Sequence, residues 1–451
     1  MSNITVNVTI VNSQLGLPQS NEGIFMLFVD NCAAVTTTFA LETPYLLSQL
    51  SDLSTLGVTS ANNPELWVHV SEFYAQAGSG CLLWICGLAI SGAYTTFLAN
   101  TVSPTFRELV ESTAQADVNY QAKGVGLCYK IPTATQSSSD FPSDVLTALA
   151  ALQTQLANLF SDGFQLFGIL DGANMSSTQT PLLLTDISAT AKYRCALMIT
   201  GSQGNGISSV GLALGTLANL SVGTSIGKVA NGSLNVNSMY LTNGIKLYAA
   251  TGLLVVGDTY TVVDAAVTYN GVTYPIGTSF IAVTGHTLFT GGNVILNSTP
   301  VQSLTTASIS SLGNKQYLFI ISNIKGFAGF YFNDDATAET DIYSLSNISA
   351  NRISNQLAYD ALVFMNFYRG SDLPVDATSG NLDAGFCSGT ASQYYSQYVA
   401  PLKISGDIAD ASLTITGVNF NSTRTVNLQL NIVRNSTFKN ANIIIQFVTS
   451  L

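Results

Sequence analysis

The chain has 451 residues and a net charge of -11, and only 9% of its residues are charged, against roughly 25% in an average soluble domain. The acidic balance excludes direct nucleic-acid binding, because phosphate contacts need clustered Lys and Arg and only 15 such residues are spread along the chain. No apolar run reaches the roughly 18 residues of a membrane helix, so we expect no membrane insertion. A surface of uncharged polar residues favours contact with further copies of the chain, since few charges would be desolvated there.

Residues 3–11 alternate strictly between apolar and polar side chains, which is the period of a half-buried strand. The apolar face consists of Ile4, Val6, Val8 and Ile10. Gly16-Leu17-Pro18 breaks this pattern, so we assign residues 1–21 to a separate N-terminal strand arm. A lone strand must join a sheet, either as an edge strand of its own chain or in a neighbouring subunit. This N-terminus lacks the basic and apolar regions of a signal peptide, which predicts synthesis in the cytoplasm.

Residues 22–230 alternate between short apolar runs and helical patterns, which is typical of an α/β domain with a mostly parallel sheet. Strands are predicted at 25–29, 81–86, 124–130, 164–170 and 195–199, and helices at 64–77, 104–115, 143–160 and 207–218. The pattern resumes with strands at 316–322 and 326–332, so residues 301–340 are assigned to the same α/β core.

Residues 231–300 differ from this core, because they are rich in Thr, Val and Tyr and carry no helical periodicity. Asn243-Gly244 and Asn270-Gly271 are typical of tight β-hairpin turns. The sequence therefore predicts an all-β module inserted into the α/β core.

Residues 341–451 are predicted to form a C-terminal α+β domain. Its long helix, near 349–368, has an apolar stripe formed by Ile353, Leu357, Ala361, Phe364 and Tyr368. Strands follow at 411–417, 425–433 and 441–448, so the chain both begins and ends with a predicted strand.

The sequence contains few residues that could act in catalysis or bind a metal or cofactor. The two histidines, His69 and His286, have no ligand at metal-binding spacing, and the six scattered cysteines are interpreted as free, mostly buried thiols. Residues 200–211 follow a strand and open a helix, but they match neither a dinucleotide loop nor a P-loop, so their glycines are predicted to form a tight turn. Asp334 and Asp335 are interpreted as turn and helix-capping residues. We therefore predict no enzyme activity, no cofactor and no metal.

Two segments resemble contractile tail sheath proteins of bacteriophages and related contractile injection systems. Residues 329–369, GFYFNDDATAETDIYSLSNISANRISNQLAYDALVFMNFYR, resemble the stretch that opens the sheath C-terminal domain. Residues 209–229, SVGLALGTLANLSVGTSIGKV, resemble the segment before the variable insertion of phage sheaths. With the terminal strands, the resemblance covers most of the chain except about 231–300.

The resemblance implies a virion structural protein, assembled in the bacterial host and located in the tail. It implies stacked hexameric rings around a tail tube, contacts with baseplate and tail terminator proteins, and contraction that drives the tube through a bacterial envelope for genome ejection. The inter-subunit strands would contain the arm residues above together with Ile443, Ile445 and Phe447. The inserted module would lie on the outer surface.

The resemblance also implies that the long C-terminal helix contacts the tube. The candidates opposite its apolar stripe are Arg352, Asn355, Gln356, Tyr359 and Asn366, although an ordinary solvated face would have the same pattern. Two other functions stay open at this point: another virion structural protein, such as a tail tube subunit, and an α/β enzyme that binds a nucleotide at residues 200–211.

Overall fold

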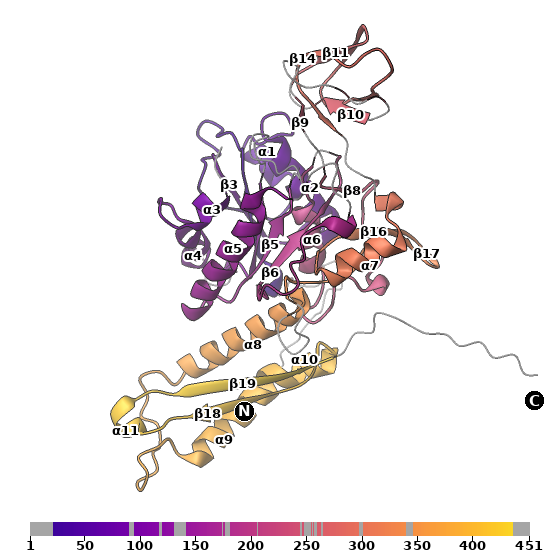
Figure 1. Ribbon diagram of the computed structural model, residues 1–451. Coiled ribbons are helices and arrows are strands. Elements are labelled where there is room, and N and C mark those ends of the chain that lie inside the picture. Colours follow the sequence, from indigo (N-terminus) through magenta and orange to yellow (C-terminus); the bar gives the residue numbers. More distant parts are fainter. Residues whose placement is uncertain are drawn as a thin grey trace, which may run out of the picture. The chain divides into compact units, whose positions relative to one another are not determined.

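The structure, a computed structural model, describes most of the chain in two compact units, residues 1–352 and 353–451 (Figure 1). The described residues are 21–89, 94–116, 120–129, 141–173, 175, 181–204, 206–243, 246–247, 254, 256, 259–262, 265–296, 301–339 and 346–435.

A six-stranded sheet forms the centre of the first unit, in the order β2-β3-β1-β4-β5-β6. Five of its strands are parallel, and β2 pairs antiparallel with β3 at one edge. The strands are β1 (Phe25–Val29), β2 (Tyr45–Leu47), β3 (Leu83–Gly87), β4 (Gly124–Cys128), β5 (Phe167–Asp171) and β6 (Cys195–Met198). Every residue of the five parallel strands is buried, which explains their continuous apolar runs. The predicted mostly parallel sheet is confirmed.

Helices cover both faces of this sheet. Helices α3 (Tyr94–Leu98), α4 (Phe106–Ala116) and α5 (Ser143–Ser161) contribute to one apolar core, with Met26 and Phe28 of β1. Helices α1 (Asp52–Thr55), α2 (Pro64–Ala77) and α6 (Val210–Ala218) contribute to the other, with Phe25 and Leu27. Successive side chains of β1 therefore point to opposite faces of the sheet and pack into the two cores in turn.

The remaining elements of the first unit are short. They are β7 (Thr200–Gly201), β8 (Tyr240–Leu241), α7 (Thr306–Asn314), β16 (Ile320–Ile324) and β17 (Phe327–Phe332), and the 3-10 helices Asn21–Gly23, Pro181–Leu183, Val229–Asn231 and Val301–Ser303. Met198 of β6 forms a parallel bridge with Leu318, so the chain returns beside the main sheet just before the β16–β17 hairpin.

Between β8 and the 3-10 helix Val301–Ser303, the regular elements of the described chain are all strands (Figure 1). It contains β9 (Lys246–Leu247), β10 (Thr259–Val262), β11 (Val267–Tyr269), β12 (Val272–Tyr274), β13 (Ser279–Ile281), β14 (Thr290–Gly291) and β15 (Val294–Leu296). These strands form sheets ordered β13-β10-β15-β9 and β12-β11-β14. The predicted turn at Asn270-Gly271 is confirmed, since Tyr269 pairs with Val272 and both turn residues have positive φ.

The second unit contains helices and one hairpin. Helix α8 (Ile348–Asn366) leads into it, and α9 (Ala384–Tyr394), a π-helix (Tyr395–Val399), α10 (Ala400–Ser405), β18 (Ile408–Thr416), α11 (Phe420–Thr423) and β19 (Asn427–Arg434) follow. The π-helix ends two residues before Pro401, whose missing N–H and bulky ring disrupt regular helical bonding. The strands near 411–417 and 425–433 were predicted, whereas α9 and α10 were not.

Candidate functional site

The antiparallel β18–β19 hairpin has one apolar face and one polar face. Ala411 lies opposite Ile432, Leu413 opposite Leu430, and Ile415 opposite Leu428. The intervening pairs are all uncharged and polar: Ser412 with Asn431, Thr414 with Gln429, and Thr416 with Asn427. Directly opposed residues share a face, so the alternation in the sequence separates the two surfaces.

Helices cover only part of the apolar face. Helix α9 packs against β18, where Leu413 and Ile415 are buried. Tyr395 donates a hydrogen bond to Asp410 Oδ1 at 3.2 Å, and Lys403 Nζ lies 3.6 Å from Asp410 Oδ2, so this strand is held to the helical segment. On β19, by contrast, Leu428, Leu430 and Ile432 are only half-buried.

The hairpin is an incomplete sheet. Within the part of the chain that the structure describes, it consists of these two strands alone, so neither outer edge has a described strand beside it. An edge strand presents alternate N–H and C=O groups, and a two-stranded sheet is marginally stable alone. A further strand with one apolar face would complete the hydrogen bonding and extend the apolar face, which makes this hairpin the candidate interaction site.

The structure does not test whether the predicted inter-subunit strands pair with this hairpin. Ile4, Val6, Val8, Ile10, Ile443, Ile445 and Phe447 all lie outside the described residues. Their pairing stays a prediction.

The prediction that Arg352 lies on an exposed helix face is wrong. Its side chain is 2% exposed, and its guanidinium donates hydrogen bonds to the backbone oxygens of Leu220 and Ser221, at 3.2 and 3.3 Å. These carbonyls follow the C-terminus of α6, where a positive charge is favourable. Arg352 therefore stabilises the first unit and is not available to a tube.

The other four helix candidates differ in exposure. Asn355 is also buried, which contradicts its assignment to an exposed face, whereas Gln356 and Tyr359 are half-buried and Asn366 is exposed. Sequence reasoning missed three exposed apolar residues, Leu362 and Val363 on the same helix and Phe367 directly after its end, which are 43%, 45% and 83% exposed. Their positions off the predicted apolar stripe were the available signal.

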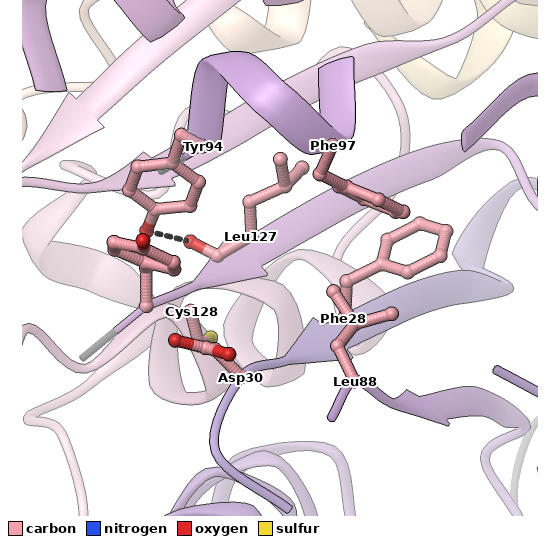
Figure 2. Close-up of a pocket in the computed structure, with 8 residues that line it drawn as sticks. Phe28, Asp30, Leu88, Tyr94, Phe97, Leu127 and Cys128 are labelled. Atoms are coloured by element: carbon pink, nitrogen blue, oxygen red, sulfur yellow. Dashed lines mark hydrogen bonds between the residues drawn. The ribbon is translucent and has the colours of Figure 1, made fainter. Parts of the chain in front are cut away.

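The first unit also has the position at which α/β proteins of this topology hold ligands. Among the parallel strands the order reverses between β1 and β4, and ligands bind at the carboxyl ends of strands beside such a reversal. Here Tyr94 donates a hydrogen bond to the Leu127 backbone oxygen at 3.1 Å, and its ring lies 4.1 Å from that of Tyr129. Figure 2 shows Phe97 and Phe28 beside them. The cavity that remains holds about one water molecule, so aromatic side chains fill this crevice.

Within residues 200–211, the described residues on either side of position 205 form a tight turn, as predicted. A Cβ on Gly201 would lie 1.9 Å from the Ile207 oxygen, and Gly206 has a φ of 82°. Within the loop, Ser202 and Ser209 donate hydrogen bonds to Glu72 Oε1, at 2.5 and 2.6 Å.

Two buried carboxyl groups line this turn. Asp171 Oδ1 accepts a hydrogen bond from the Ser208 N–H at 2.8 Å. Burial raises the pKa of Glu72 to about 7 and that of Asp171 to about 8, although hydroxyl and N–H donors oppose the shifts. A nucleotide phosphate would meet two carboxyl groups here, in place of the basic or free N–H groups that bind it.

The cysteines and Asp335 have the roles predicted for them. All six cysteines are free thiols, and four are buried, which confirms the prediction. Asp335 accepts hydrogen bonds from the Ser349 hydroxyl and N–H at the start of α8, at 2.5 and 3.3 Å, so the predicted capping role is confirmed for it. Within the described ranges, no three His, Cys, Asp or Glu side chains are grouped as metal ligands.

None of the described helices has the length and apolar character to span a membrane.

Comparisons with known proteins agree with this architecture. A family model described as DUF2586, N-terminal domain, matches residues 4–253. The fold is similar to the anti-feeding prophage helical sheath in its contracted state, with a TM-score of 0.53 and 9% identity over 99% of this chain and 100% of that chain. It is also similar to a chain of the anti-feeding prophage baseplate, with a TM-score of 0.52 and 10% identity over 100% of both chains. No curated protein matches the sequence. The predicted resemblance to sheath proteins is thus confirmed for the fold.

Proposed function

This chain belongs to the DUF2586 family through its N-terminal domain at residues 4–253, and we propose that it is the structural subunit of a contractile tail sheath. It polymerises as stacked hexameric rings around a tail tube, and it contracts to drive that tube through a bacterial envelope. Its partners are further copies of itself, the tube protein, and baseplate and tail terminator proteins of a phage tail or a related injection system. The observation that carries this proposal is the incomplete β18–β19 sheet in a chain with a sheath-like fold.

Terminal segments of neighbouring subunits complete the hairpin. In residues 3–10 the apolar Ile4, Val6, Val8 and Ile10 alternate with Asn and Thr, as the half-buried Leu428, Leu430 and Ile432 alternate with polar residues on β19. A strand added in register would therefore continue both faces of the hairpin. Residues 441–448, with Ile443, Ile445 and Phe447, are the second candidate strand of this mesh.

The mesh keeps subunits connected while they move. A backbone hydrogen bond contributes only about 0.5 to 1.5 kcal/mol net, but an added strand forms several of them in every subunit. The free energy of contraction comes from the difference between contacts in an extended and a compact lattice, stored during assembly. No nucleotide and no catalytic residue is needed, and the filled crevice beside Tyr94 and the carboxyl groups around residues 200–209 support this non-enzymatic proposal.

Other parts of the chain have separate roles in this proposal. The exposed side of α8 contacts the tube, with Gln356, Tyr359 and Asn366 retained from the predicted set. Residues 341–451 form the tube-side domain, and the inserted module of residues 231–300 lies on the outer surface.

Deletion of residues 1–12 tests the mesh. The truncated chain should stay monomeric under conditions in which the full chain forms hollow striated cylinders by negative-stain electron microscopy. Val6→Asn with Val8→Asn should have the same effect, because it removes the apolar face. The matched control, Thr5→Ser with Thr9→Ser, changes only the polar face and should assemble normally. Normal cylinders from the truncated chain would contradict the proposal.

A further inference from the structure

The inserted β-module contains a surface without charge. Residues 265–314 include no Asp, Glu, Lys or Arg, in a chain whose net charge is -11. Acidic and basic residues therefore all lie elsewhere, and His286 is the single histidine of this stretch.

Within this stretch, residues 272–283 form an exposed ribbon, which we call the uncharged ribbon. It consists of β12, a turn and β13. Strand β12 is the edge of the three-stranded sheet, and β13 is the edge of the four-stranded sheet. The ribbon exposes four large apolar side chains, Val272 (51%), Ile276 (60%), Ile281 (58%) and Val283 (42%).

The inner side of the ribbon is firmly packed. Phe280 is buried, and its ring lies 4.5 Å from the ring of Tyr269 and 4.9 Å from that of Tyr274. The Tyr269 hydroxyl accepts a hydrogen bond from the Val283 N–H at 2.7 Å and donates one to the His286 oxygen at 3.0 Å. The outward direction of Ile281 and Val283 is thus fixed by the core of the module.

An exposed edge strand with apolar side chains usually also carries a charged side chain, which prevents it from pairing with strands of other chains. The uncharged ribbon has no such charge on β12 or β13. Contact with a charged surface would desolvate charges that the ribbon cannot pair, whereas contact with an equally uncharged surface desolvates none. Two copies of this chain repel through their net charge, and the ribbon is a surface at which they can meet without bringing like charges into contact.

We propose that the uncharged ribbon is a self-association surface, which contacts another part of the uncharged stretch of residues 265–314 in a neighbouring copy of this chain. This inference rests on the proposed polymerisation and adds a lateral contact to it, separate from the β18–β19 hairpin. The contact buries Ile281 and Val283 and engages the outer edge of β13.

Hydrogen exchange of the full-length chain, as monomer and as polymer, measures this contact directly. Amides of β13 on its outer edge should exchange at least about tenfold more slowly in the polymer, because the backbone groups of that edge become covered, whereas the Val283 amide already donates to Tyr269 and serves as an internal reference. Equal exchange in the two states would overturn the inference, whether the ribbon is then free or reserved for another partner such as a glycan.

A charge substitution tests whether the contact matters for assembly. Ile281→Lys should raise the concentration needed for polymerisation by about tenfold or more, since an unpaired ammonium group would be desolvated. Gln115→Lys adds the same charge at an exposed helical position and should leave that concentration unchanged. Thermal unfolding of both monomers checks that the module stays folded.

The two proposals fail differently. If the full-length wild-type chain forms no polymer under any condition, the sheath proposal fails. If it forms cylinders and Ile281→Lys forms them at the same concentration, the sheath proposal stands and the ribbon contact is overturned.

Discussion

The protonation state of Glu72 differs between the folded and the unfolded chain at the same pH, because folding buries its carboxyl group. It is 8% exposed, it accepts hydrogen bonds from two serine hydroxyls, and its Oε2 lies 3.8 Å from Nδ1 of His69. Burial raises its pKa from 4.5 to about 7. Its stabilising contribution is therefore fully present below about pH 4.5 and is lost as the pH rises through 7, by roughly 3 kcal/mol.

Glu72→Gln should remove this pH dependence. The free energy of unfolding of the wild-type monomer, measured by urea denaturation, should fall between about pH 4.5 and 7, and the variant should fall less over that window. Asp171, with a pKa raised to about 8, adds a decline that continues to higher pH, and His69, with a pKa lowered to about 4, acts in the opposite direction below pH 6.5. Glu42→Gln, at an exposed position, is the control and should keep the wild-type profile. An unchanged profile in Glu72→Gln would show that this carboxyl group is ionised at neutral pH.

The burial of Arg352 is an example of a residue property that a single sequence does not determine. Helical periodicity placed it opposite the apolar stripe, but a polar side chain can be buried where backbone oxygens accept its hydrogen bonds. Its acceptors, after α6, lie more than 100 positions earlier in the chain. No local pattern contains that information, so the exposed-face prediction was wrong. The three serines near Glu72 and Asp171 were missed for the same reason.

Helices α2 and α6 pack with their backbones in close contact. A Cβ on Gly211 would lie 2.0 Å from the His69 oxygen, and one on Gly215 would lie 2.3 Å from the Phe73 oxygen. These glycines therefore set the distance between the two helices. Ordinary helix propensity predicts the opposite preference, because Ala stabilises a helix interior by about 1 kcal/mol relative to Gly.

Gly211→Ala should accordingly destabilise the monomer by about 3 kcal/mol or more, since the helices must separate. Gly389→Ala is the matched control in α9, where no atom lies within 4 Å of the added Cβ. It should stabilise by up to about 1 kcal/mol. Chemical denaturation of both variants measures the difference, and similar values would contradict the close packing.

Elements were predictable where local pattern and burial agree. Strand β1 and helix α2 have the bounds that the sequence indicated, because continuous apolar runs and a Pro at the first helical position are local signals. Strand β2 is three residues long, and α9 contains Gly and Ser without a clear apolar stripe, so neither was found. Their positions depend on β3 and β18, which they pack against.

At the scale of the whole molecule, the net charge of -11 opposes polymerisation. Salt screens such repulsion, with a Debye length of about 10 Å at 0.1 M and about 3 Å at 1 M. If interfaces are mainly uncharged strands, raising NaCl from about 0.05 to about 0.5 M should lower the concentration needed for polymerisation several-fold. Light scattering measures this, and sucrose at equal osmolarity is the control. Weaker polymerisation in salt would show that ion pairs hold the copies together.

Within the described chain no strand lies beside either outer edge of the β18–β19 hairpin, and this has a consequence for the timing of assembly. Neither strand carries a Lys or Pro that would discourage unwanted pairing. Newly made subunits in excess would therefore join one another before reaching a template. On the proposed function, the cell must keep their supply low and let an initiating ring decide where growth starts. The length of a finished tail is then set by the event that stops growth at the far end.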